Sequence, residues 1–148
     1  MNWPAALRPR DFLPHGEAFL FVDEICSLAG REIVATRRVP LEEPWTLAHF
    51  SGNPIVPGVL LLEGMVQTCG ILARNQESSG AGERPRVGTL ASVQSARFRH
   101  IVRPGALLVY RASLLVKAGD LYSFEASTFV DDVHVADAKV CLSIVKQL

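Results

Sequence analysis

Residues 57–73, P-G-V-L-L-L-E-G-M-V-Q-T-C-G-I-L-A, decide the fold. From Val59 to about Ala73 the run is apolar nearly all round, and a helix with that pattern is buried on most of its sides. Pro57 stands near the first turn, where a missing backbone N–H costs nothing. The stretch therefore predicts one long central helix that other elements must surround.

The segments on both sides of this helix are typical of β-strands. Two segments rich in β-favouring side chains precede it, with a turn at Ala29-Gly30 between them, and four more follow it. Short turns between alternating segments make neighbouring strands antiparallel. We therefore expect an α+β fold in which one sheet curls around the helix. The predicted strands, about six in all, cover residues 19–26, 33–39, 89–99, 107–116, 121–130 and 133–145.

Two connections interrupt this pattern. Residues 40–58 carry four prolines and two glycines, which forbid regular structure over most of that stretch. Residues 75–88 are polar and rich in Gly and Ser, and we interpret them as a mobile loop rather than a linker between domains. The 148 residues are enough for one ordinary domain, so the chain is expected to be a single domain over residues 1–148.

Composition excludes several classes of protein. Hydrophobic residues make up 49% and charged residues 20%, which argues against disorder. Fifteen basic residues balance fifteen acidic ones, so neither nucleic acid nor an anionic membrane is an expected partner. No apolar stretch reaches the ~18 residues of a membrane span, and no signal peptide is evident. Cys26, Cys69 and Cys141 are interpreted as buried small hydrophobes, and the expected location is cytoplasmic.

Glu63 is the first residue that packing does not explain. It stands inside V-L-L-L-E-G-M-V, and an isolated buried carboxylate is expensive. Glu63 must therefore face a solvent-filled cleft, have a partner or remain protonated. The simpler alternative is a side chain that reaches water at the edge of the helix. Gln67 is four positions later and shares the same helix face.

His49 is the second such residue, although a lone histidine is more often structural. It precedes a loop made rigid by Pro54 and Pro57. At the helix start, the N–H of Gly58 lacks an internal partner and can polarise a carbonyl oxygen. A base, a carboxylic acid and an oxyanion donor are the groups needed to remove a proton next to a carbonyl and expel a β-hydroxyl.

The run H-F-S-G-N-P-I-V-P-G-V-L-L-L-E-G-M-V-Q, residues 49–67, resembles the central motif of the hotdog-fold 3-hydroxyacyl-(acyl-carrier-protein) dehydratases of fatty acid synthesis. It is closer to the FabZ type than to the FabA type. Upstream, L-P-H-G-E-A-F-L-F-V-D-E-I at residues 13–25 resembles the opening block of the family. Downstream, A-R-F-R-H-I-V-R-P-G at residues 96–105 resembles a later block. The three blocks come in family order and span most of the chain.

The resemblance implies roles for individual residues. His49 matches the catalytic histidine and Glu63 the catalytic carboxylate, fourteen positions later. Gly58 matches the glycine whose N–H binds the thioester carbonyl, and Gln67 matches a glutamine near the carboxylate. The expected oxyanion and substrate-binding set is completed by Phe50, Pro57 and Val59. In the family, the histidine and carboxylate of one site come from different subunits, so we expect a homodimer at least, with a trimer of dimers as the alternative.

The resemblance implies no metal and no other cofactor, and an acyl carrier protein as partner, which brings the acyl chain on a phosphopantetheine arm. An acidic carrier fits the stretch from Arg84 to Gly119, which holds seven basic residues and no acidic one. Within it, Arg97, Arg99 and Arg103 are the candidate docking residues. The alternative is an ordinarily charged, solvated sheet surface.

The sequence also departs from the family pattern. Ser51 replaces a usual proline, residues 16–18 read G-E-A, His100-Ile101 replaces a common R-P pair, and Ala106 replaces a usual Asp. These departures leave acyl chain length and pathway open between fatty acid and polyketide or secondary-lipid synthesis. FabA-type enzymes, which also isomerise the double bond, tend to have Asp at the carboxylate position, so by this resemblance Glu63 favours dehydration without isomerisation. The competing hypotheses are an acyl-CoA thioesterase of the same fold and a non-catalytic acyl-binding subunit, and His15 is interpreted as structural.

Overall fold

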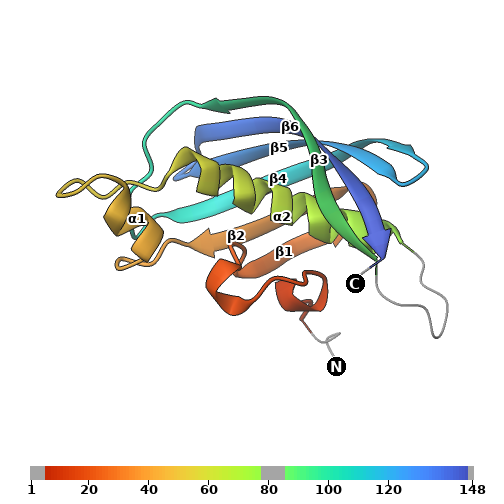
Figure 1. Ribbon diagram of the computed structural model, residues 1–148, viewed down its shortest axis with the longest axis horizontal. Coiled ribbons are helices and arrows are strands. Elements are labelled where there is room, and N and C mark those ends of the chain that lie inside the picture. The colour runs from red at the N-terminus through yellow and green to blue at the C-terminus, as the bar shows by residue number, and fades with distance from the viewer. Residues whose placement is uncertain (1–5, 78–85, 147–148) are drawn as a thin grey trace.

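The computed structural model of the chain describes residues 6–77 and 86–146, and its central feature is a helix lying across a curved sheet (Figure 1). The helix is α2, Gly58–Gln76. The strands are β1 (Glu24–Ala29), β2 (Glu32–Arg38), β3 (Arg86–Phe98), β4 (Leu107–Ala118), β5 (Leu121–Val130) and β6 (Val133–Lys146). A short helix, α1 (Pro44–His49), lies near the N-terminal end of α2, and two 3-10 turns, Pro9–Asp11 and Glu17–Phe19, precede β1.

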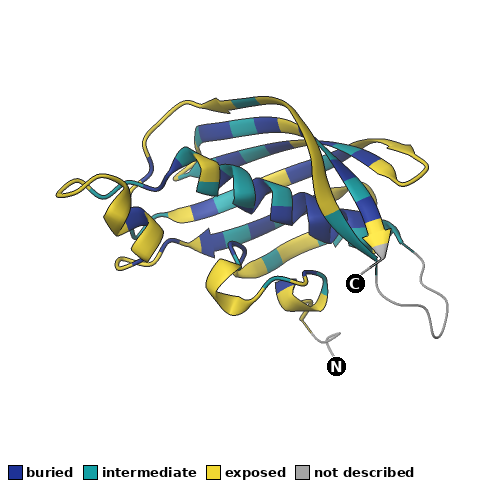
Figure 2. Cartoon of the chain, viewed as in Figure 1, coloured by how far each residue is buried: buried dark blue, intermediate teal, exposed yellow. Residues whose placement is uncertain are grey.

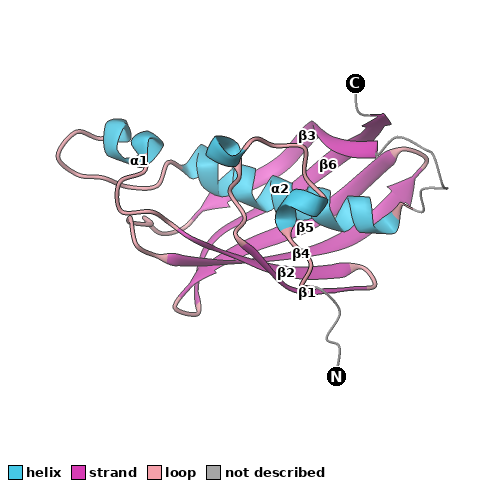
Figure 3. Ribbon diagram, turned by 90° about the horizontal axis from the view of Figure 1, so that it is seen from below, coloured by secondary structure: helices cyan, strands magenta, loops and turns pink. Residues whose placement is uncertain are grey.

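The six strands form one sheet in the order β1-β2-β4-β5-β6-β3, and every neighbouring pair is antiparallel. Strands β1 and β3 are its two edges. Viewed from below, the sheet forms one layer and α2 lies against one of its faces (Figure 3). The tight turn between β5 and β6 uses positive φ at Asp131 and Asp132 (47° and 63°), as a two-residue hairpin of the primed type requires. The predicted α+β architecture, with one long helix and about six antiparallel strands, is confirmed.

The core lies between α2 and the sheet. The face of α2 from Leu61 to Ala73 is mostly buried, as its nearly uniform apolar sequence predicted, whereas α1 and β3 are largely exposed (Figure 2). Tyr110 and Phe124 are among the largest fully buried side chains of the sheet. A Cβ at Gly64 would overlap the hydroxyl of Tyr110, so the glycine is what allows the helix to approach the sheet here. Among the described residues, none of the helices combines the length and apolar character needed to cross a bilayer.

Four details differ from the sequence expectations. The strand expected over 19–26 begins only at Glu24, because Leu20–Val22 crosses α2 and the Phe21 N–H is donated to a helix side chain instead of a neighbouring strand. The proline-rich segment 40–58 contains the helix α1, whose first residue is Pro44. Of the loop expected over 75–88, Asn75 and Gln76 belong to α2 and residues 86–88 to β3, while 78–85 lie outside the described residues. Finally, of the three cysteines expected to be buried only Cys69 is: Cys141 is half-buried, and Cys26 is exposed because it lies at a bulge in the edge strand β1.

Candidate active site

The N-terminal turn of α2 provides unpaired backbone donors. Pro57 precedes the helix in an extended conformation (ψ 137°), with no side chain capping the turn. Its carbonyl accepts from the N–H groups of Leu60 and Leu61. Within the described residues, no hydrogen bond is donated by the N–H of Gly58 or of Val59. These two donors, at the positive end of a 19-residue helix, are suited to an electron-rich oxygen.

A pocket opens beside this turn. It has a volume of about 210 Å³ and is lined by Gly58 and Leu61 of α2, by Phe98 at the end of β3 and by residues 99–102 that follow it. The ring of Phe98 packs over Gly58, 3.3 Å from the position a Cβ would take. Phe98 is itself half-exposed, as is Phe50, and Val59 is 71% exposed. An exposed phenylalanine ring over the helix start provides an apolar surface that suits an apolar ligand or a protein partner.

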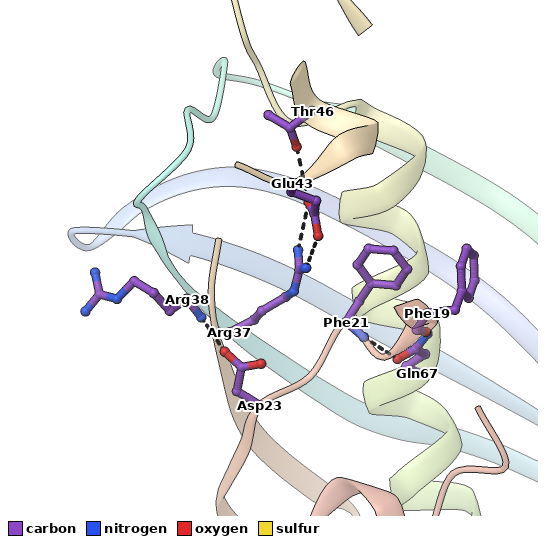
Figure 4. Close-up of polar contacts among 8 residues, drawn as sticks. All are labelled: Phe19, Phe21, Asp23, Arg37, Arg38, Glu43, Thr46 and Gln67. Carbon is purple, nitrogen blue, oxygen red and sulfur yellow. Dashed lines mark hydrogen bonds and ion pairs between the residues drawn. The ribbon is translucent and has the colours of Figure 1, made fainter. Parts of the chain in front are cut away.

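Glu63 lies on α2, and its carboxylate is held by the helix itself. Its side chain is 25% exposed, and Oε1 accepts a hydrogen bond of 2.9 Å from Nε2 of Gln67. Gln67 is buried and oriented by two backbone partners: its Oε1 accepts from the Phe21 N–H and its Nε2 donates to the Phe19 carbonyl, each at 2.9 Å (Figure 4). Every hydrogen-bonding group of the amide except one lone pair is thereby used within the protein. The structure therefore places Gln67 as a support of Glu63.

His15 is a second neighbour of Glu63. Its Nε2 lies 3.6 Å from Glu63 Oε1, and its Nδ1 is buried without a hydrogen-bond partner among the described residues. His15 belongs to the L-P-H block of the sequence, from which we expected only a structural role. Its contact with the carboxylate was not anticipated, because 48 positions separate the two residues and only the crossing of α2 by this segment brings them together.

His49 is the last residue of α1 and is exposed. Its ring stacks on that of Phe50, with centroids 4.4 Å apart and planes at 22°. Within the described part of the chain, no hydrogen bond or ion pair joins His49 to Glu63, whose polar neighbours are Gln67 and His15. One chain thus carries both groups without a direct contact between them.

The basic stretch does not form one patch. Arg97 and Arg99 line a polar hollow of about 440 Å³ on the sheet, where Arg99 pairs with Asp137 at 2.8 Å. Arg103 lies apart and donates to Asn53 Oδ1 at 2.8 Å, in the loop before α2. The other members are engaged or undescribed: Arg86 pairs with Glu77 and Asp120, Arg111 packs over Phe129, Lys117 packs over Tyr122, and Arg84 lies outside the described residues.

The sequence matches the family model for a FabA-like domain over residues 13–139. A 3-hydroxyacyl-(acyl-carrier-protein) dehydratase FabZ from Campylobacter concisus is 40% identical over 136 residues, which is 90% of this chain and 92% of that protein. The FabZ of Syntrophobacter fumaroxidans is 38% identical over 133 residues, covering 90% of this chain and 88% of that one.

Solved structures share the architecture at low sequence identity. A chain of the dehydratase heterocomplex ApeI:P from Xenorhabdus doucetiae superposes with a TM-score of 0.78 at 16% identity, covering 95% of this chain and 93% of that one. A hypothetical thioesterase with coenzyme A from Streptococcus pneumoniae gives a TM-score of 0.65 at 13% identity, with 84% and 86% covered. These likenesses confirm the hotdog fold. They do not decide between the two activities, because both classes of protein have it.

Proposed function

Since this chain belongs to the FabA-like family, we propose that the α2 turn, Glu63 and His49 catalyse the dehydration of 3-hydroxyacyl thioesters carried on acyl carrier protein. The enzyme is a lyase of fatty acid biosynthesis or of a related polyketide pathway, and its product is a trans-2-enoyl thioester. One observation carries this proposal. In a chain that matches FabZ dehydratases over 90% of its length, one helix carries the unpaired N–H of Gly58 among the described residues and a carboxylate, Glu63, held by Gln67.

The reaction begins with the thioester carbonyl at the start of α2. The Gly58 N–H donates to the carbonyl oxygen, and the helix dipole favours the negative charge that develops there. This lowers the cost of removing the proton at C2, because the electron pair left on C2 is shared with the carbonyl. Neutral His49 takes that proton.

The carbon–oxygen bond at C3 then breaks as the C2–C3 double bond forms. The leaving hydroxyl takes a proton from Glu63 and departs as water, so that His49 ends the step protonated and Glu63 ionised. In this step Oε2 is the oxygen of Glu63 that donates the proton, because Oε1 accepts from Gln67 Nε2. Transfer of one proton from His49 to Glu63 through solvent restores the starting state.

The active site in this proposal is assembled from two copies of the chain. Glu63 and Gly58 of one copy face His49 of the other, which fits the absence of any bond between His49 and Glu63 within the described residues of one chain. The edge strand β3 supports such an assembly, since Leu90 and Val93 on it are 46% and 40% exposed. An unpaired apolar edge is a natural surface for another strand.

Arg97 and Arg99 are the proposed docking residues for the acidic carrier protein, and Arg103 is a more distant candidate. Reversing the charge at Arg97 and Arg99 should raise KM for carrier-bound substrate and leave KM for a small thioester analogue unchanged, with the difference shrinking as salt is added. An equal effect on both substrates would assign these residues to folding instead.

A product assay tests the activity. The protein is incubated with a 3-hydroxyacyl carrier-protein thioester, and enoyl thioester and free thiol are both measured over time. The expected result is enoyl product without free thiol. Free thiol alone would mean that the chain is a thioesterase, and neither product would mean that it only binds acyl chains.

A further inference from the structure

Two buried charged residues lie outside the groups that carry the reaction. Arg37 on β2 is 6% exposed and Glu43, which precedes α1, is 5% exposed, and their side chains form an ion pair through both guanidinium Nη atoms (Figure 4). We propose that this pair is a positioning device for His49: it fixes α1, and with it the catalytic base, on the sheet. The inference rests on the proposed function.

The buried position of Arg37 is explained by the alternation of inward and outward side chains along β2. Ile33, Ala35 and Arg37 occupy successive inward positions of the strand, so an arginine stands where the period of two calls for a core residue. Arg38, one position on, points outward and is exposed; its N–H donates to Asp23 at 2.7 Å. A guanidinium at the inward position needs a carboxylate partner inside the protein, and Glu43 supplies it.

Helix α1 has little else to hold it in place. Six residues are too few for a helix that is stable by itself, and of Pro44–His49 only Thr46 is buried. Trp45 and Leu47 are 44% and 45% exposed, and among the described aromatic pairs Trp45 makes one, an edge-to-face contact with Phe19. The position of α1 therefore depends on polar contacts at its start.

Those contacts make the beginning of α1 and the ion pair one unit. The Glu43 carbonyl accepts from the N–H groups of Thr46 and Leu47, while the Glu43 carboxylate accepts from Thr46 Oγ1 at 3.1 Å. The same carboxylate forms the ion pair with Arg37 on the sheet. His49 lies at the other end of this short helix, so any movement of Glu43 is carried directly to the histidine.

Phe21 connects this anchor with the support of Glu63. The guanidinium carbon of Arg37 lies 4.6 Å from the centroid of the Phe21 ring, and the N–H of Phe21 is donated to Gln67. Phe21 thus packs against Arg37, which anchors α1 and His49, and donates a hydrogen bond to Gln67, which supports Glu63 (Figure 4).

A buried ion pair is a poor device for stability alone, because well-packed apolar residues of similar volume often serve as well or better. What apolar residues lack is the directional fork of a guanidinium on a carboxylate, which fixes both distance and orientation. The test therefore has to separate the placement of His49 from the folding of the chain.

The experiment measures kcat, KM and Tm for a set of variants of the full chain. Glu43→Gln and Arg37→Met each break the pair and should lower kcat about 10- to 100-fold with KM within about twofold, since a base displaced by an ångström loses activity on that scale. Arg37→Lys keeps the charge and should recover part of the loss. Arg38→Met, on the same strand but facing outward, is the matched control and should keep the kcat of the wild type.

The double variant Arg37→Met with Glu43→Leu replaces both buried charges by apolar groups and decides the question even if a single variant folds poorly. A Tm near that of the wild type with kcat still low supports positioning. If kcat recovers together with Tm, or if Glu43→Gln folds and keeps the wild-type kcat, the inference is wrong. Should the wild type and Arg38→Met also form no enoyl product, it is the proposed dehydratase activity that fails.

Discussion

The two regions that carry the proposed chemistry are held in opposite ways. Glu63 stands on a 19-residue helix whose inner face is buried, and its carboxylate is bonded to Gln67, itself tied to two backbone groups. His49 ends a six-residue helix that is mostly exposed and is anchored through one ion pair. The acid is therefore positioned by the core itself, whereas the base is positioned by a peripheral element. Substitutions in the two regions should consequently differ in how far activity and stability change together.

The sharpest test of this contrast is His49→Ala, for which we expect the largest loss of activity. Removing the general base should reduce kcat by on the order of 10⁴-fold. Because His49 is exposed, Tm and oligomeric state should stay as in the wild type. The measurements are enoyl-thioester formation, a thermal melt and size-exclusion chromatography. Unchanged turnover would refute the assigned role of His49.

At Gly58, a pair of substitutions separates the N–H from the side-chain space. Gly58→Pro removes the donor at the first helical position, where proline is tolerated, and should lower kcat by about 10²- to 10³-fold. Gly58→Ala keeps the N–H and adds only a Cβ, 3.3 Å from the ring of Phe98, which is half-exposed and free to shift. The alanine variant should therefore stay within about tenfold of the wild type. Equal losses in the two variants would show that packing against Phe98, not the N–H, is what matters.

Gln67→Met should behave in the opposite manner to His49→Ala, with stability and activity falling together. The substitution leaves the Phe21 N–H and the Phe19 carbonyl without their buried partner, which should cost about 2 kcal/mol of unfolding free energy. It also releases the Glu63 carboxylate, so kcat should fall roughly tenfold. Chemical denaturation and steady-state kinetics measure the two effects. A variant as stable as the wild type would mean that Gln67 is not the support that the geometry indicates.

The sequence predicted the region around α2 better than the region around α1. The apolar run 59–73 predicted the buried helix, and the alternating segments predicted most of the sheet, because both patterns reflect local burial. Glu63 stood out for the same reason, since a carboxylate in an apolar run is anomalous wherever it lies. Their spacing of four predicted that Gln67 and Glu63 share one helix face, and the structure adds the hydrogen bond between them.

The peripheral region was less accessible to sequence reasoning. The prolines of segment 40–58 hid α1, because a proline at the first helical turn looks the same in sequence as one in a loop. The ion pair of Arg37 and Glu43 was missed too, although an inward-facing arginine after Ile33 and Ala35 was a usable signal. The contact between His15 and Glu63 was out of reach, since it depends on where a chain segment crosses α2.

The smallest expected effect concerns Tyr110, which faces Gly64, the residue after Glu63. Its hydroxyl is buried without a partner among the described residues, and burial raises its pKa above the ordinary tyrosine value, so it stays neutral. Tyr110→Phe removes an unsatisfied polar group and should stabilise the fold by about 1 kcal/mol while leaving kcat unchanged. Gly64→Ala alone should destabilise by about 1–3 kcal/mol, because the new methyl group overlaps both the hydroxyl and the ring carbon Cζ of Tyr110. Tyr110→Phe removes the overlap with the hydroxyl and leaves that with the ring, so the combination should recover only part of the loss. Denaturation of the four proteins measures this coupling. If kcat drops in Tyr110→Phe, the hydroxyl acts on Glu63, and the acid would then depend on more than the bonds that hold its helix in place.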